Sequence, residues 1–178
     1  LGNLPPWMKF IRSADIGQPG VIVDALASWK IPSYGAFMVV GNGFHEIRNQ
    51  TDESISRVFR GYRQAGIIIV FTEESALRIE DILESAWNTY HAGFKYVHER
   101  SGQVLRPAEE WDQLRSCGSL RSSWASCAEE AGYLRVEQYC TRSRTIFPYK
   151  PQNGRNPAIS VNHFLVPRQM AKELGLSN

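Results

Sequence analysis

The sequence is poor in the features that mark several classes of protein. Its cysteines, Cys117, Cys127 and Cys140, are odd in number and show no C-x-x-C spacing, which indicates reduced thiols rather than a disulfide framework. No apolar run approaches the roughly 18 residues of a membrane-spanning helix, and no signal-peptide pattern opens the chain. Long blocks of like charge are absent, and the net charge is only +2. We therefore expect a cytoplasmic protein that binds neither a membrane nor a nucleic acid.

The length and composition are those of one soluble globular domain. The chain has 178 residues, of which 43% are hydrophobic and 21% are charged, so it can bury a sizeable core. Residues 1–20 include the turn-rich stretch 15–20 and predict an irregular N-terminal segment ahead of a core at 21–178. The chain starts at Leu1 rather than at methionine, so we expect a fragment, a processed form or an excised domain.

A strand–helix–strand pattern occupies residues 36–75. The apolar run 36–40 is followed by a polar turn at 41–49 and then by apolar residues at helical spacing, namely Ile55, Val58, Phe59 and Tyr62. The helical pattern stops at Gly66, and a second apolar run follows at 67–71. This order predicts a βαβ unit of a parallel sheet. Because open α/β sheets bind ligands where strands end, the turn at 41–49 is the best candidate for a functional site.

The segments on either side extend the α/β order. Residues 21–25 are interpreted as a short buried strand, and residues 73–75 place negative charge at the start of a helix that ends near Gly93. Residues 94–107 are expected to be irregular. A further apolar helix face at 120–131 precedes a long strand at 133–147 and a last strand at 159–166. The loop between these two strands is too short for a crossover helix, so they are expected to form an antiparallel hairpin.

Four segments carry a resemblance to a known family. They are residues 23–25 (V-D-A), 39–47 (V-V-G-N-G-F-H-E-I), 59–66 (F-R-G-Y-R-Q-A-G) and 127–133 (C-A-E-E-A-G-Y). Together with the order of strands and helices, they resemble the C-terminal half of the class I S-adenosylmethionine-dependent methyltransferases. The resemblance implies an α/β fold with a Rossmann-like, methyltransferase-type sheet, mostly parallel with a C-terminal antiparallel hairpin and incomplete. The acidic glycine-rich turn of the family has no convincing counterpart, since residues 15–20 read as an ordinary loop.

The resemblance also implies an activity and a set of site residues. The activity is transfer of a methyl group from S-adenosylmethionine to a small-molecule acceptor. The residues expected to bind the cofactor are Asp24, Ala25, Asn42 and Gly43, and those expected to contact the acceptor are His91, Tyr96 and His98. His45 or Glu46 would be catalytic, by orienting the acceptor or by removing its proton.

Other interpretations stay open. The glycines at 41–43 suit a tight turn, Asp24 could cap a turn, and His163 on the last strand suits a core or edge position. A non-catalytic methyltransferase-like module that needs a partner segment is one alternative function. A metal-dependent hydrolase built on His45, Glu46 and the later histidines is a weaker one, and no metal site is predicted because the spacing of His91 and His98 is not a recognised zinc spacing.

The incomplete sheet predicts a partner. If residues 36–40 form a central strand, one of its edges lacks a neighbour apart from the strand expected at 21–25. An open strand edge must be paired or covered. We therefore expect a homodimer through this edge or a companion N-terminal segment that pairs with it.

Overall fold

The computed structural model describes residues 5–77, 88–108, 114–116, 119–144 and 158–177. Within this part of the chain, five strands form one mixed sheet in the order β1-β2-β7-β5, and β6 also pairs with β7. The strands are β1 (Phe37–Gly41), β2 (Ile68–Glu74), β5 (Tyr133–Arg135), β6 (Thr141–Arg144) and β7 (Ala158–Pro167). A separate two-stranded sheet joins β3 (Leu114–Ser116) and β4 (Ser119–Arg121).

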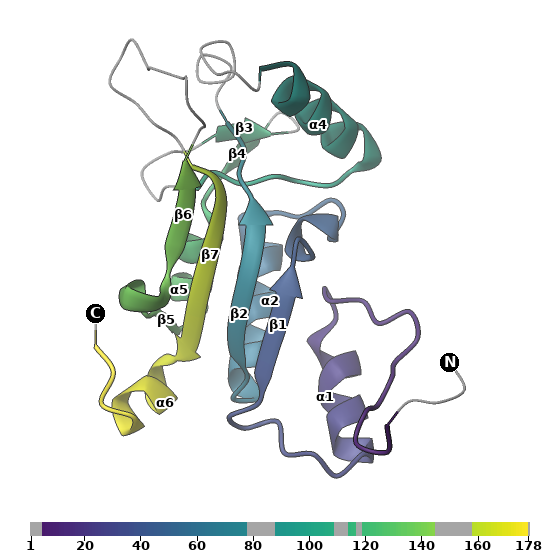
Figure 1. The fold of residues 1–178 in the computed structure, drawn as a ribbon, viewed down its shortest axis with the longest axis vertical. Helices are drawn as coiled ribbons and strands as arrows, with labels where there is room; N and C mark the ends of the chain where they lie inside the picture. Colours follow the sequence, from purple (N-terminus) through teal and green to yellow (C-terminus); the bar gives the residue numbers. More distant parts are fainter. Residues whose placement is uncertain (1–4, 78–87, 109–113, 117–118, 145–157, 178) are drawn as a thin grey trace.

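The sheet is mostly antiparallel, so the expectation of a mostly parallel sheet is wrong. Only β1 and β2 pair in parallel, whereas β7 is antiparallel to β2, β5 and β6 (Figure 1). The physical reason is that a parallel pair needs a crossover, and within the described residues α2 (Asp52–Gln64) alone connects two neighbouring strands of the sheet in that way. The antiparallel pairing of the last two strands, β6 and β7, is confirmed.

One face of the sheet is covered by α2 and α5 (Trp124–Glu130). The helix α2 begins with a capping box, because the Thr51 hydroxyl accepts the N–H of Ser54 at 3.1 Å and the Ser54 hydroxyl accepts the N–H of Thr51 at 2.8 Å. It ends before Gly66, whose φ of +72° is left-handed. Aromatic rings fill the core between the layers, with Phe44 packed against Phe59, Phe71 and Trp124.

Residues 21–25 form part of a helix and not the expected strand. They lie in α1 (Pro19–Ser28), with Pro19 in its first turn. A short apolar run cannot be assigned to a strand or a helix by its period, and here the helix was the correct alternative. Helix α1 contacts α2 and lies on the side of the sheet that α2 covers, near the lower end of β1 in the view of Figure 1.

Three further boundaries differ from the expected ones. Residues 73 and 74 belong to β2 and do not begin a helix, while residues 78–87 of the expected helix lie outside the described residues. Helix α4 (Asn88–Ser101) continues through residues expected to be irregular. The long strand expected at 133–147 is broken by the 3-10 helix η2 (Glu137–Tyr139), so β5 and β6 pair with successive parts of β7.

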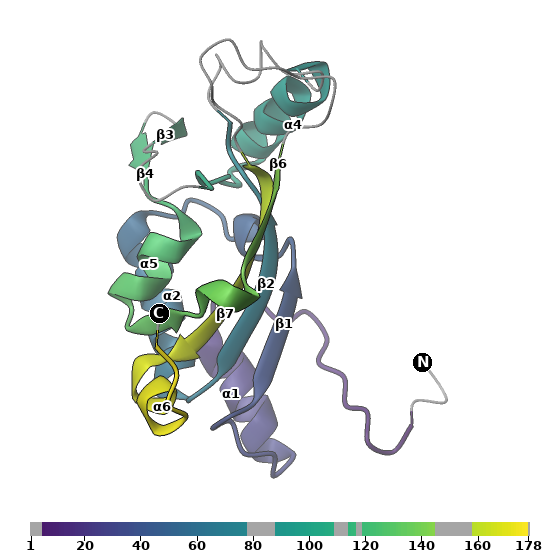
Figure 2. The ribbon, with the colours of Figure 1, turned by 60° about the vertical axis from the view of Figure 1, so that its left-hand side comes forward.

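The other face of the sheet is only partly covered. Helix α6 (Arg168–Glu173) places Met170 and Ala171 against a small apolar cluster that includes Ile68, Leu134 and Val166. Over β1 and the adjoining part of β2, this face carries no helix of the described chain (Figures 1 and 2). Among the described helices, none is long and apolar enough to cross a membrane.

Candidate functional site

The carboxyl ends of the two parallel strands meet at the turn that the sequence singles out. Strand β1 ends at Gly41, and the turn continues through Asn42 and Gly43 into the 3-10 helix η1 (Phe44–Glu46). The Asn42 N–H donates to the carbonyl of Thr72 on β2 at 2.8 Å, although Asn42 has a left-handed φ of +50°. Gly43 has no space for a side chain, because an added Cβ would lie 2.7 Å from the Val40 side chain. The turn is therefore fixed against both strands.

A buried histidine–carboxylate pair lies directly behind this turn. Glu73 lies near the C-terminal end of β2 and has no exposed surface. One of its carboxylate oxygens accepts the N–H of Phe44 at 2.6 Å. Its other oxygen lies 2.8 Å from Nδ1 of His45. Because a carboxylate can only accept, Nδ1 of His45 carries the proton and Nε2 of the neutral ring keeps a lone pair. The pair therefore holds His45 in one orientation and in the tautomer of a base.

The electrostatic surroundings favour the protonated form of His45. Burial by itself lowers the pKa of His45, but the hydrogen bond and the charge of Glu73, with the charges of Glu46 and Glu74, outweigh burial and raise it. The pKa of Glu74 is also raised, chiefly by burial, although His45 and His98 act in the opposite direction. An imidazole whose pKa is set by a buried carboxylate is a candidate functional-site residue.

Two other predicted residues adjoin this pair. Glu46 is exposed, and its carboxylate lies 3.5 Å from Nε2 of His45 and accepts a hydrogen bond from the side-chain amide of Gln103. His98, on α4, is buried, and its ring centre is 5.0 Å from that of His45. Residues distant in the sequence therefore converge on His45 from β2, η1 and α4.

Other predicted residues are not brought to the pair. Asp24 and Ala25 lie on α1, beside the lower half of β1, whereas the turn is at the upper end of that strand (Figure 1). Tyr96, on α4, is 65% exposed. The side chain of His91 lies outside the described residues. Within the described residues, no group of three or more His, Cys, Asp or Glu side chains is arranged to hold a metal ion.

Glu73 is the site residue to which the sequence interpretation gave too little weight. A carboxylate of the pair at 73 and 74 could face the pocket at the end of a strand, but a solvated helix start was the favoured interpretation, whereas β2 continues through both positions. The signal was present in the alternation along the strand, since Glu73 lies on the same face as the apolar Ile69 and Phe71. A carboxylate that continues the buried face of a strand needs a partner inside the protein.

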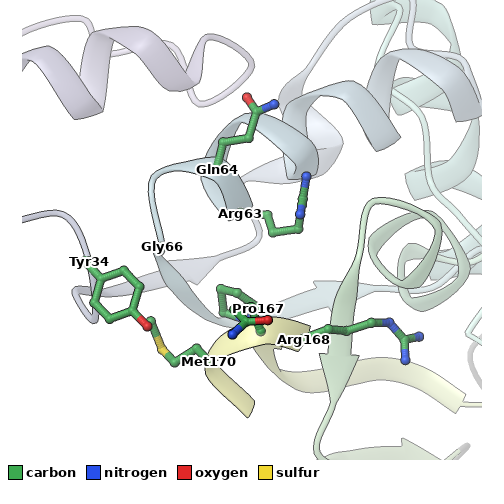
Figure 3. A pocket seen from close by; sticks show the side chains of 8 residues that line it. Tyr34, Arg63, Gln64, Gly66, Pro167, Arg168 and Met170 are labelled. Carbon is green, nitrogen blue, oxygen red and sulfur yellow. The ribbon is translucent and has the colours of Figure 1, made fainter. Parts of the chain in front are cut away.

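Two shallow pockets lie away from the pair. One, of about 220 Å³, is lined by Tyr34, Arg63, Gln64, Gly66, Pro167, Arg168, Gln169 and Met170. Figure 3 shows that the guanidinium groups of Arg63 and Arg168 do not converge on a common point. The other, of about 270 Å³, is lined by Gly17, Pro19, Ile47, Arg48, Asn49, Ser54, Arg57 and Val58. Neither lining includes His45, Glu73 or His98.

Comparison of the chain with protein-family models and with curated protein sequences gave no match.

Proposed function

We propose that this chain takes part in methyl transfer from S-adenosylmethionine to a small-molecule acceptor at the carboxyl ends of β1 and β2. The resemblance of the sequence supplies the reaction and the cofactor. The observation that carries the chemistry is the buried Glu73 carboxylate 2.8 Å from Nδ1 of His45, at the edge of the sheet where α/β proteins bind ligands. The helix between β1 and β2 and the antiparallel strand β7 also fit the order of elements that the resemblance implies.

The fit of the chain to the cofactor is confined to the turn. Gly41 and Asn42 are exposed, and an added Cβ on Gly41 would meet nothing within 4 Å, so a ligand can approach the backbone there. Asn42 and Gly43 would form one wall of the cofactor site. Asp24 and Ala25 stay proposals of the resemblance, because α1 lies beside the other half of β1.

S-adenosylmethionine, when bound, supplies an electrophilic methyl group on a positively charged sulfur. The residues of the chain position the acceptor for in-line attack, which is the main contribution an enzyme makes to such a displacement. Asn42 and Gly43 would hold the cofactor, and transfer of its methyl group to the acceptor heteroatom would leave S-adenosylhomocysteine as the second product. The proton that the acceptor loses passes to Nε2 of His45, while Glu73 stabilises the resulting imidazolium. Glu46 lies 3.5 Å from this nitrogen and the ring of His98 packs against that of His45, so both would orient the acceptor. Tyr96 and His91 stay proposals of the resemblance.

Calorimetric titration with S-adenosylhomocysteine tests the cofactor site. We expect wild-type protein to bind and Asn42→Ala to bind at least roughly tenfold more weakly. Asn49→Ala is the matched control, because Asn49 is also exposed and also has a left-handed φ, +53°, but lies beyond η1. Equal weakening by both variants, or no binding by the wild type at millimolar ligand, would contradict the proposal.

The second candidate is a non-catalytic interaction module that docks on another polypeptide. The observation that favours it is the uncovered apolar face of β1, on which Val39 is 80% exposed. Such a module and the enzyme both need a partner at β1, either a second copy or a companion segment. The free thiols Cys127 and Cys140 fit the reducing cytoplasm, which we propose as the location.

A further inference from the structure

The 3-10 helix η1, which carries His45, is held by a buried amide that follows it in the chain. Gln50 is 1% exposed, and its Nε2 donates to the carbonyls of Phe44 at 3.3 Å and of Ile47 at 3.0 Å. These two carbonyls lie on either side of His45 and Glu46 in the chain. The Phe44 carbonyl also accepts the N–H of Ile47 at 3.2 Å. A single side chain therefore braces both ends of η1.

The orientation of the Gln50 amide is fixed by Arg106. Nε of Arg106 donates to Oε1 of Gln50 at 2.9 Å. Because a guanidinium can only donate, the amide oxygen must face Arg106 and the amide NH2 group must face η1. Arg106 has no exposed surface and is itself held by Asp52 at 2.6 Å and by the carbonyl of Ser122 at 2.9 Å. The amide thus has one arrangement that satisfies its contacts.

The main chain of Arg106 contacts the strand that carries Glu73. Its carbonyl accepts the N–H of Ala76 at 2.8 Å, and Ser75 forms an isolated parallel bridge with Arg106. Strand β2 ends one residue before this bridge. Arg106 therefore holds both halves of the histidine–carboxylate pair. Its backbone fixes the end of β2 beside Glu73, and its side chain fixes η1 through Gln50.

Stability alone does not account for this arrangement. Within the residues that the structure describes, the buried Nη2 of Arg106 has no hydrogen-bond partner. A buried donor without a partner costs free energy, and a buried ion pair such as that of Arg106 with Asp52 adds little net stability. Buried hydrogen bonds of this kind do fix the orientation of the groups that they contact, which is how functional side chains are held in place.

We propose that Gln50, held by Arg106, is a positioning residue for the His45–Glu73 pair. It fixes η1 against the end of β2, so that Nδ1 of His45 stays 2.8 Å from the Glu73 carboxylate. The inference deepens the proposed function, because the residues that Gln50 positions are the proposed base and its partner. The hydrogen bonds on which it rests involve no atom of a cofactor or an acceptor.

A double-mutant cycle, followed by NMR titration of the imidazole C–H signals, tests the inference. Gln50→Met keeps the length of the side chain and removes its three hydrogen bonds. We expect the pKa of His45 to fall by roughly half a pH unit or more toward its ordinary value, because the Glu73 contact that raises it is loosened. In a Glu73→Gln background the same substitution should cause no further fall, since Gln50 acts through that contact.

Ser56→Ala is the matched control for the loss of a buried hydrogen bond. Ser56 is also 1% exposed, but its hydroxyl bonds to Glu130 on α5, at 3.1 Å, and not to η1. We expect this variant to be less stable with an unchanged titration of His45. Every variant keeps the other titratable groups near His45, which are Glu46, Glu74 and His98.

A second variant covers the case in which Gln50→Met does not fold. Arg106→Lys keeps a positive charge beside Asp52 but lacks the Nε donor that orients the amide, so the same fall in the pKa of His45 is expected. A less stable Gln50→Met with an unchanged titration of His45 would give Gln50 a structural role alone and overturn the inference.

Two further results would also overturn the inference. They are an equal fall in Ser56→Ala and a further fall in the Glu73→Gln background. The titration needs no cofactor, so failure of S-adenosylhomocysteine to bind would contradict the proposed function and leave the result for Gln50 unaffected.

Discussion

Two buried histidines in this protein respond to pH in opposite directions. Glu73 raises the pKa of His45, whereas burial, with the charges of Arg135 and Arg142, lowers the pKa of His163 to about 3. The His45–Glu73 contact therefore stabilises the fold fully below the unfolded pKa of about 6.5 and loses this contribution as pH rises through the folded value. For His163, stability is instead lost as pH falls from about 6.5 toward 3, because only the unfolded state binds the proton.

Replacement of Glu73 by glutamine tests the histidine–carboxylate pair. We expect Glu73→Gln to lower the pKa of His45, because the charge of Glu73 is lost and burial is then opposed only by the charges of Glu46 and Glu74. The measurement is an NMR titration of the imidazole C–H signals. His163 is the internal control, since its pKa should stay near 3 in the variant. An unchanged titration of His45 would show that Glu73 does not set its charge state.

At the scale of elements, one buried arginine connects the start of two helices. Arg106 has no exposed surface, and its guanidinium donates to Asp52 at 2.6 Å, to the side chain of Gln50 at 2.9 Å and to the carbonyl of Ser122 at 2.9 Å. It also lies 5.1 Å from the ring centre of Trp124. The first turns of α2 and α5 are thereby held together.

Loss of Arg106 should cost far more than loss of a surface arginine. We expect Arg106→Met to lower the free energy of unfolding by about 3 kcal/mol, because the partly buried Asp52 carboxylate then loses its ion pair. Arg57→Ala is the matched control on α2, since Arg57 pairs with Glu53 in an exposed contact, and we expect a change of less than about 1 kcal/mol. Urea unfolding of both variants measures the difference, and similar losses would contradict the assignment.

At the scale of the whole molecule, we expect the open face of the sheet to determine dye binding and self-association. We expect the wild type to bind a hydrophobic dye and to self-associate with rising concentration, and Val39→Lys to reduce both. Val97→Lys is the control, because Val97 is 60% exposed on α4 but does not lie on the sheet. Dye fluorescence and light scattering make the measurement, and equal effects of the two lysines would point to net charge rather than to the sheet face.

The elements that short sequence patterns determine could be predicted from the sequence alone. The helical spacing of α2, its end at Gly66 and the strands β1, β2 and β7 all follow from patterns within a few residues. The turn at 41–46 was therefore found, and with it His45 and Glu46. Residues 21–25 were misassigned because a short apolar run satisfies a strand and a helix equally well.

What the sequence could not supply depends on contacts between distant segments. Glu73 and His45 are 28 positions apart in the chain, and only the register of β1 with β2 brings them together. The same holds for His98, which reaches His45 from α4. The break of the expected strand at 133–147 follows from the pairing of β5 and β6 with one long partner, β7.

The position of β7 has a consequence for how the chain is made. Within the part of the chain that the structure describes, every pairing of the main sheet except that of β1 with β2 involves β7, which follows the other four strands in the sequence. During synthesis, β1 and β2 leave the ribosome long before their sheet can be completed, and contacts this distant in sequence form slowly. The β7-facing edge of β2 therefore stays unpaired until translation has passed residue 167.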